Sequence, residues 1–272
     1  MLGLIYILMS LGLTMLYGIM HIVNFAHGEV YMLGAMGTYF LTVHYKVPYF
    51  LALLIVAVAS IPFGLVVDRV IFRPIRGKWL QLLVATVGLS MVLQSASWVS
   101  FGILDKGVTH PFKFILRFWM ATISGERFCA AILGAMLVFC ILLLIYRTKL
   151  GRAMRAIEED EGAARLQGVP PNFISAINVS IGFVLASVAG GLMAPVFVVN
   201  PGMGFGPLLI AFIVIIIGGL GSIAGCILGG LLVGLIQTVS AVFLGVEITY
   251  GLLFALVIIV LIIKPTGLMG HA

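Results

Sequence analysis

The chain has 272 residues, of which 62% are hydrophobic and 9% are charged, with a formal net charge of +6. A water-soluble domain of this length needs a charged surface, so the composition excludes one. Several uncharged runs reach the roughly 20 residues that a helix needs to cross about 30 Å of hydrocarbon. Because lipid offers the backbone no hydrogen-bond partner, these runs must be helical. The sequence predicts an all-α, polytopic transmembrane bundle, with residues 1–272 forming a single domain.

The hydrophobic runs predict eight or nine membrane spans, some of them short or broken by glycine. In chain order, the predicted spans are Leu2–Ile19, Val30–Val43, Tyr49–Val67, Trp79–Gly102, Phe128–Tyr146, Ile174–Phe197, Pro207–Leu220, Ile223–Leu244 and Tyr250–Ile263. Val30–Val43 would rise only about 21 Å at 1.5 Å per residue. Only the glycine-rich turn Gly218–Ser222 separates two of the later spans. The glycine pairs Gly225–Gly229 and Gly230–Gly234 predict close helix packing.

Two basic segments predict the orientation in the membrane. The first segment, Asp68–Lys78, carries four basic residues against one acid, and the second begins at Arg147. Cytoplasmic loops carry an excess of Lys and Arg, and the two spans between these segments would return the chain to the same side. The amino terminus and the connection Ile103–Arg127 would then lie outside. Because the basic residues flank apolar spans, they indicate topology and not a nucleic-acid partner.

The most polar interval, Arg147–Asn172, predicts a short amphipathic helix with a strong stop at Gly168 and the prolines that follow. Met154 and Ile157 share its apolar face, and an acidic cluster follows them. A solvated loop helix would explain this pattern. Docking of the apolar face into a groove on a cytoplasmic partner would explain it too. The docking hypothesis assigns that role to Arg152, Met154, Arg155, Ile157, Glu158, Glu159, Asp160, Glu161, Gly162, Arg165 and Gly168.

Polar residues between His21 and Glu29 interrupt the first two predicted spans. Polar groups at membrane depth usually face a cavity or one another, although a short cytoplasmic turn would also fit. The spacing of His21, His27 and Glu29 is too common to predict a metal site. Broken spans often border a substrate path, because irregular backbone is tolerated there. A translocation path is therefore predicted at Asn24, Phe25, His27, Gly28, Glu29, Gly219, Gly221 and Ser222.

The amino-terminal string GLTMLYGIMHIVNFAHGEVYMLGAMGTYF resembles the signature of branched-chain amino acid ABC transporter permeases, and specifically of their smaller permease subunit. The likeness continues through Asp68–Lys78, Leu150–Val169, Gly218–Gly234 and Lys264–Gly270. It covers essentially the whole chain in order.

This resemblance implies a multi-pass subunit of the bacterial inner membrane that translocates leucine, isoleucine and valine. It further implies a homologous second permease, a periplasmic substrate-binding protein and two cytoplasmic ATPase subunits. Leu150–Val169 matches the coupling loop of the family, so residues 147–172 are expected to dock on an ATPase. No GxxxxGK[ST] pattern is present, so ATP is expected to bind the partner subunits and this chain to need no cofactor.

Other functions remain open at this point. The family that the chain resembles also includes permeases for urea and short-chain amides, so the motifs specify the transporter type better than its cargo. An ion-coupled secondary transporter would share the composition, but such carriers keep ionisable groups in mid-span, and here the charges lie almost wholly at span ends. The protease patterns GxSxG and HExxH are absent, which argues against an enzyme.

Overall fold

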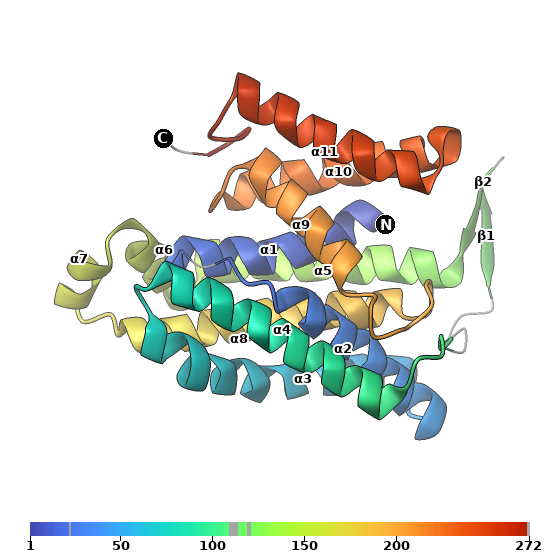
Figure 1. Cartoon of the computed structure of the whole chain (residues 1–272), viewed down its shortest axis with the longest axis horizontal. Helices are drawn as coiled ribbons and strands as arrows, with labels where there is room; N and C mark the ends of the chain where they lie inside the picture. The colour runs from blue at the N-terminus through green and yellow to red at the C-terminus, as the bar shows by residue number, and fades with distance from the viewer. Residues whose placement is uncertain (22, 109–113, 119–120, 271–272) are drawn as a thin grey trace.

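The computed structural model describes residues 1–21, 23–108, 114–118 and 121–270. Long helices lie side by side along one direction, with a short hairpin at one end and two small helices at the other (Figure 1). The helices are α1 (Leu2–Met20), α2 (His27–Tyr39), α3 (Tyr49–Val67), α4 (Trp79–Phe101), α5 (Gly125–Arg147), α6 (Lys149–Glu159), α7 (Glu161–Leu166), α8 (Pro171–Met193), α9 (Phe205–Gly218), α10 (Ile223–Leu244) and α11 (Val246–Ile263). The π-helices η1 (Phe40–His44) and η2 (Asp68–Phe72) extend α2 and α3, and the 3-10 helix η3 (Arg73–Ile75) follows.

Helices α1 and α8 form the centre of the bundle. Most residues of both helices are buried, whereas α3, α4 and α10 leave much of their apolar surface exposed. Helices α2 and α3 pack against one side of α8, and α9 and α10 pack against α1. Apolar side chains that face outward, such as Val84 and Met91 of α4, are suited to lipid contact.

Six described helices are long and apolar enough to cross a membrane. They are Leu2–Met20, Tyr49–Ile75, Trp79–Phe101, Gly125–Arg147, Pro171–Met193 and Ile223–Leu244. The other three predicted spans correspond to the shorter helices α2, α9 and α11. The polytopic helical bundle is therefore confirmed, while the count of eight or nine spans stays a prediction.

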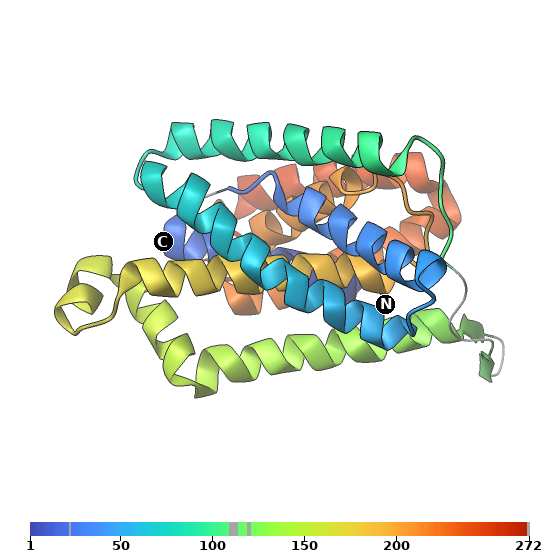
Figure 2. The ribbon, with the colours of Figure 1, turned by 90° about the horizontal axis from the view of Figure 1, so that it is seen from below.

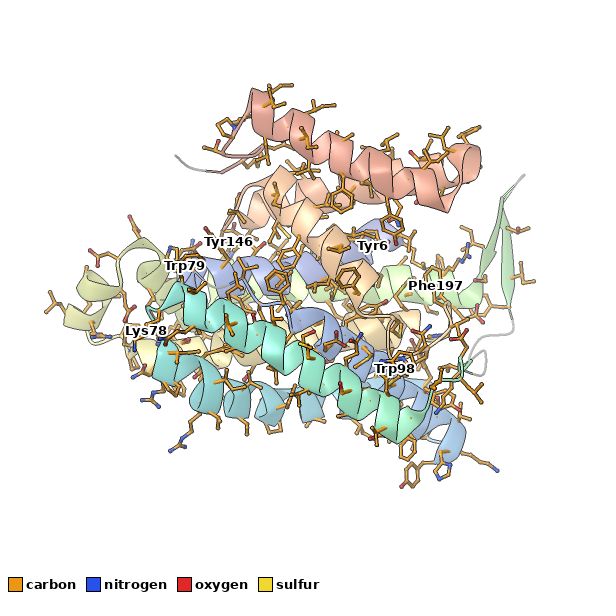
Figure 3. All side chains as sticks on the ribbon, viewed as in Figure 1. Tyr6, Lys78, Trp79, Trp98, Tyr146 and Phe197 are labelled. Atoms are coloured by element: carbon orange, nitrogen blue, oxygen red, sulfur yellow. The ribbon has the colours of Figure 1, made fainter. Side chains whose placement is uncertain are left out.

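Exposed aromatic residues lie toward both ends of the bundle. Trp79 and Tyr146 lie toward the end that carries α6 and α7, and Trp98 lies toward the opposite end (Figure 3). Trp79 and Trp98 are about 28 Å apart along α4 at about 1.5 Å per residue, close to the thickness of the hydrocarbon core. Because Trp and Tyr favour the membrane–water interface, the long axis of the bundle lies along the membrane normal.

The two basic segments meet at one end, as predicted. Arg76 Nη1 donates to Asn172 Oδ1 (3.1 Å), and its Nη2 donates to Ser175 Oγ (2.6 Å). The same guanidinium lies 3.5 Å from the carboxylate of Asp68. These contacts tie the turn before α4 to the start of α8.

A hairpin at the opposite end was not predicted. Strands β1 (Ile115–Phe118) and β2 (Ala121–Ser124) pair antiparallel, with Ile115 opposite Ser124. They lie in the predicted outer connection Ile103–Arg127, of which residues 109–113 and 119–120, including Lys113, lie outside the described part of the chain. The run Thr122–Ile123 is β-branched, a weak strand signal that the all-α prediction overlooked.

Glycines allow the central helices to touch through their backbones. A Cβ atom on Gly34 of α2 would collide with the backbone of Ser187 in α8, and one on Gly190 of α8 would collide with the Tyr31 carbonyl. The predicted pairs in α10 behave likewise, since Gly229 contacts α9 and Gly234 contacts Gly3 of α1. Small residues thus provide the van der Waals packing that holds helices together in lipid.

Gly190→Ala should lower the melting temperature of the detergent-purified chain. The added methyl group meets backbone atoms that cannot move aside, and such overpacking costs about 1–3 kcal/mol. Gly88→Ala is the matched control, because nothing lies within 4 Å of that position in α4. The control should unfold at or above the parental temperature, since alanine favours a helix by about 1 kcal/mol over glycine. Equal melting temperatures in the two variants would contradict this packing.

Candidate functional site

The segment between α5 and α8 forms a protruding helical hairpin at the end of the bundle (Figure 2). The Thr148 hydroxyl accepts a hydrogen bond from the Gly151 amide (3.1 Å) and caps α6. Asp160 caps α7 by accepting from the Ala163 amide (3.0 Å). The helical segment breaks at Asp160, two residues before Gly162, because the Asp160 side chain favours the cap over a continuous helix. The predicted stop is confirmed, since Gly168 has φ +83°.

The apolar face of α6 is not available to a partner protein. Met154 and Ile157 are 4% and 5% exposed, and both belong to the core that also contains α1, α5 and α8. The prediction that these two side chains enter a groove on an ATPase is therefore wrong for the chain in this arrangement. An amphipathic helix buries its apolar face on the nearest apolar surface, which here is the chain's own membrane domain.

The residues of the acidic cluster, Glu158 to Glu161, have different roles in the structure. The Glu161 carboxylate accepts from Arg165 four residues later (2.7 Å), while Asp160 serves as a cap. Glu158 turns inward, so that its carboxylate lies against Gly18 of α1 and near Gly221. Burial raises the pKa of Glu158 above its usual range, although Arg155 acts in the opposite direction.

Glu158 and Gly221 come from two sites that were predicted separately, and the structure brings them together. Both line a small cavity of about 20 Å³ that also contacts Thr14 and Asn178. Asn178 Nδ2 donates to the Met15 carbonyl of α1 (2.8 Å). Movement of α6 would therefore act directly on the inner ends of α1, α8 and α10.

The outer face of the hairpin contains a residue that the sequence interpretation missed. Leu166, at the end of α7, is 92% exposed, although its neighbours on the loop are polar. Arg152 and Glu159 are exposed too, while Arg155 lies over the ring of Tyr146 (5.3 Å). In the sequence, the one sign of this exposed site is a single leucine among polar residues shortly before Gly168.

The polar break between α1 and α2 lies inside the bundle. Asn24 and His27 are fully buried, and His27 Nε2 donates to the carbonyl of Met9 (3.2 Å), near the middle of α1. Gly28 meets the backbone of Gly204, the residue that caps α9. A short turn at the membrane surface does not fit this burial, because α2 and α9 both begin beside the middle of the bundle.

The remaining residues of this predicted path contact different helices. The Glu29 carboxylate accepts from Ser90 of α4 (3.1 Å), and Phe25 packs on Phe212 of α9 (5.3 Å between ring centres). His21 lies beside Tyr17. No group of three His, Cys, Asp or Glu side chains suited to a metal occurs among the described residues.

The glycine turn at Gly218–Ser222 supports the carboxyl-terminal segment. Gly219 (φ +106°) and Gly221 (φ +84°) adopt backbone conformations that favour glycine, and Ser222 caps α10 by accepting from the Gly225 amide (3.1 Å). The amide of Leu268 donates to Ile217 (2.8 Å). The structure thus places the two predicted path segments in separate environments, and their role in translocation stays a prediction.

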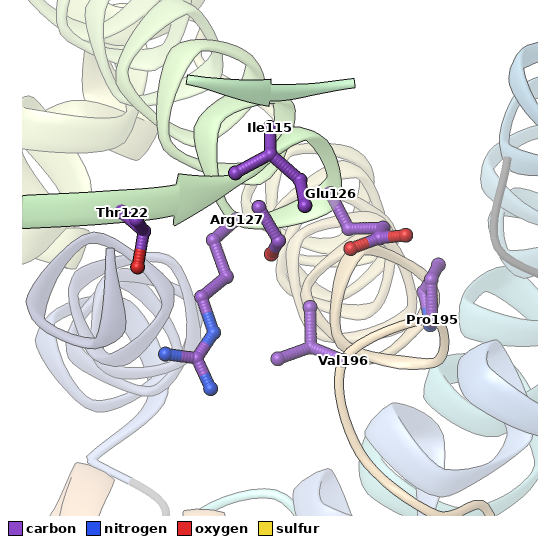
Figure 4. Close-up of a pocket in the computed structure, with 7 residues that line it drawn as sticks. Ile115, Thr122, Glu126, Arg127, Pro195 and Val196 are labelled. Atoms are coloured by element: carbon purple, nitrogen blue, oxygen red, sulfur yellow. The ribbon is translucent and has the colours of Figure 1, made fainter. Parts of the chain in front are cut away.

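A hollow of about 440 Å³ lies at the opposite end, between the hairpin, the start of α5 and the connection after α8. Arg127 extends from α5 toward this space, with Thr122 on the strand side and Pro195–Val196 across from it (Figure 4). The hollow is lined by polar and apolar side chains alike, with the charged residues Glu126 and Arg127 among them, so it suits contact with a soluble molecule or protein.

Ile157→Asp should destabilise the isolated chain in detergent, without any partner present. A carboxylate at this buried site replaces core packing, and such changes commonly exceed about 3 kcal/mol. Leu166→Asp is the matched control, because the same kind of change falls on an exposed residue. The control should melt within a degree or two of the parent. Comparable losses in both variants would refute the burial of the α6 face.

Similarity to known proteins covers the whole bundle. Residues 1–263 match the family described as branched-chain amino acid transport system / permease component. The high-affinity branched-chain amino acid transport system permease protein BraD of Pseudomonas aeruginosa is 35% identical over 286 residues, covering 99% of this chain and 92% of the relative. LivH of Escherichia coli, with the same description, is 34% identical over 292 residues with the same coverage.

A more distant relative is the permease protein LivM of Salmonella typhimurium, which is 25% identical and covers 97% of this chain and 68% of the relative. No solved structure matches the chain. The family match spans nearly every element described above, from α1 to α11. The chain belongs to the permease-component family of branched-chain amino acid transport systems.

Proposed function

We propose that this chain is a membrane-spanning permease subunit of a binding-protein-dependent ABC importer that carries leucine, isoleucine and valine. The observation that carries the proposal is the similarity over 99% of the chain to relatives described as high-affinity branched-chain amino acid transport permeases. The predominantly apolar bundle supports a transport role and no catalytic one. In this role the chain carries no cofactor and binds no nucleic acid.

The membrane is the bacterial inner membrane, with the basic end that carries α6 and α7 in the cytoplasm. The excess of Arg and Lys at this end supports that orientation. In the assembled transporter α2, α9 and α11 complete a set of nine spans with the six long helices. The meeting of α2 and α9 inside the bundle supports two partial spans that begin at mid-depth.

The partners are a second permease, two ATPase subunits and a periplasmic binding protein. The similarity to LivM supports a homologous second permease and not a second copy of this chain. The binding protein would face the end with the hairpin. The translocation path runs along the contact between the two permeases, and lipid covers the remaining apolar surface.

The segment 147–172 is the coupling loop in this proposal. Its exposed outer face supports docking of α7, with Leu166 as the apolar anchor and the exposed charged residues Arg152, Glu159 and Arg165 on the same helical hairpin. Glu158 and the buried face of α6 would then transmit movement to α1, which α6 contacts directly, and to the turn at Gly221 that precedes α10. The ATP-driven switch is a rigid-body rearrangement of this kind.

Two alternatives differ in cargo or in energy source. A permease for urea or a short-chain amide would share the fold, but the names of the full-length relatives favour branched-chain amino acids. An ion-coupled carrier would use buried ionisable groups, and Glu29 and His27 are buried here. Such a carrier would need no ATPase and would respond to an ion gradient.

The transport proposal is tested by reconstituting the chain with its second permease, ATPases and binding protein in vesicles. We expect uptake of leucine, isoleucine and valine that requires ATP and the binding protein. Urea and acetamide should neither be carried nor compete. Uptake by the chain alone, driven by a proton or sodium gradient, would contradict the ABC assignment.

Leu166→Ala should weaken association with the ATPases and lower uptake. Burying one leucine contributes roughly 1.5–3 kcal/mol, so the affinity should fall by about one to two orders of magnitude. Val99→Ala is the matched control, because Val99 is 88% exposed on α4, at the other end of the bundle. Normal ATPase copurification with Leu166→Ala would remove α7 from the docking surface.

A further inference from the structure

A cavity of about 490 Å³ lies between α1, α2, α9, α10 and α11, in the half of the bundle away from α6 and α7. Small-molecule sites usually enclose roughly 300–1,000 Å³. Phe197 and Val242, both exposed, stand on its wall. In Figure 3, Tyr6, another wall residue, lies toward the end of the bundle that carries Phe197 and away from the end that carries Lys78. The cavity therefore lies toward the side from which an imported molecule arrives.

Neutral polar side chains from four helices line this cavity. They are Tyr6 of α1, Tyr31 of α2, Gln237 and Thr238 of α10, and Thr249 and Tyr250 of α11. Tyr6 and Tyr31 are 6% and 2% exposed, and both line the cavity together with Gln237. Gln237 Oε1 is buried and has no hydrogen-bond partner among the described residues. Polar groups inside a membrane domain are costly and commonly mark a substrate route.

The remainder of the wall is made mainly of apolar side chains, with Ile5 of α1 and Ile210 of α9 among them. The amino-terminal end of α9 lies next to Tyr250, since a Cβ on Gly206 would be 3.6 Å from the tyrosine hydroxyl. The start of a helix carries partial positive charge and favours a carboxylate, although Pro207, the residue of this first turn that lines the cavity, has no N–H to donate. The cavity thus combines an aliphatic surface, hydroxyl and amide groups, and a helix amino terminus.

A second cavity of equal volume shows that this lining is specific. It is about 490 Å³ and lies among α3, α5 and α8, with Leu65, Leu137 and Phe173 on its wall. The Ser180 hydroxyl there donates to the carbonyls of Ala176 (2.9 Å) and Ile61 (3.2 Å). That surface offers little except hydrocarbon, which suits a lipid chain. The two cavities thus have the same volume, but only the first of them is lined by tyrosine and glutamine side chains.

We propose that the cavity of Tyr6, Tyr31, Gln237 and Tyr250 is a transit site for the branched-chain amino acid. The aliphatic side chain of the ligand packs on Ile5 and Ile210. The ammonium group donates to Gln237 Oε1 and the tyrosine hydroxyls, while the carboxylate faces the start of α9. The inference rests on the proposed function and adds a site to it.

The neutral lining suits a site that the cargo must leave. A charged side chain in the cavity would form an ion pair with the ammonium or carboxylate group of the amino acid. Such charge-assisted hydrogen bonds are strong at a buried site of low dielectric constant, so the amino acid would leave slowly. Neutral hydroxyl and amide groups can orient the amino acid and bind it less tightly than a charged side chain would. Selection of the cargo then occurs mainly at the binding protein, and this cavity accepts any small amino acid with an aliphatic side chain.

The test compares Gln237→Leu and Tyr6→Phe with Ser180→Ala in the reconstituted complex. Each cavity variant removes hydrogen bonding to a charged group, so uptake at subsaturating substrate should fall by about tenfold. ATP hydrolysis stimulated by the binding protein should persist, because coupling is intact. Ser180→Ala removes a hydroxyl from the second cavity and should transport like the parent. Unchanged uptake in both cavity variants would overturn the site.

Ligand protection supplies a second measurement that needs no defective variant. Thr238 also lines the cavity, so Thr238→Cys introduces a thiol there, and the parent chain gives the background from the native cysteines. Millimolar isoleucine should slow the maleimide reaction of Thr238→Cys, and arginine should not. Equal rates with and without isoleucine would overturn the proposal. If the parent complex carries no branched-chain amino acid at all, the proposed function fails; a transporting parent with no protection refutes only the cavity.

Discussion

Close backbone contact between α1 and its neighbours is the constraint on which the rest of the structure depends. A Cβ on Gly12 of α1 would lie 3.0 Å from the carbonyl of Gly182 in α8 and 2.8 Å from the His27 ring. That closeness lets His27 reach the Met9 carbonyl and starts α2 beside the middle of α1. In lipid, where no hydrophobic force drives helices together, such packing and buried hydrogen bonds determine the arrangement.

The same packing explains why the two ends of the bundle differ. At the basic end, α6 lies on α1 and α5 through its apolar face, and Glu158 reaches Gly18 of α1 and the turn at Gly221 before α10. At the other end, α9, α10 and α11 surround a cavity with polar groups. Helix α1 contributes to both regions, with Tyr6 near one end and Gly18 near the other. A shift of α1 would therefore change both regions at once.

Most of the helices could be predicted from the sequence, because a backbone surrounded by lipid can satisfy its hydrogen bonds within one segment only as a helix. Ile223–Leu244 and Tyr49–Val67 match their predicted bounds, since long uncharged runs can only be helical in a membrane. The hairpin at Ile115–Ser124 was missed because it lies outside the apolar runs, where that argument has no force. Helix α2 begins at His27, three residues before the predicted span, because its polar first turn is buried by other helices and not by lipid.

Site residues were harder to predict, because periodicity shows which residues share a face and not what covers that face. Met154 and Ile157 were correctly placed on one side of α6, yet their cover is the chain itself. Tyr6, Tyr31 and Gln237 lie in unremarkable apolar runs, and only the packing of several helices makes them neighbours. Leu166 of α7 is exposed, whereas Ile157 of α6 and Ala164 of α7 are buried. In the proposed coupling role, a partner that binds the exposed side of α7 would therefore act on the bundle through the contacts of α6 with α1 and through those of α7 with α8.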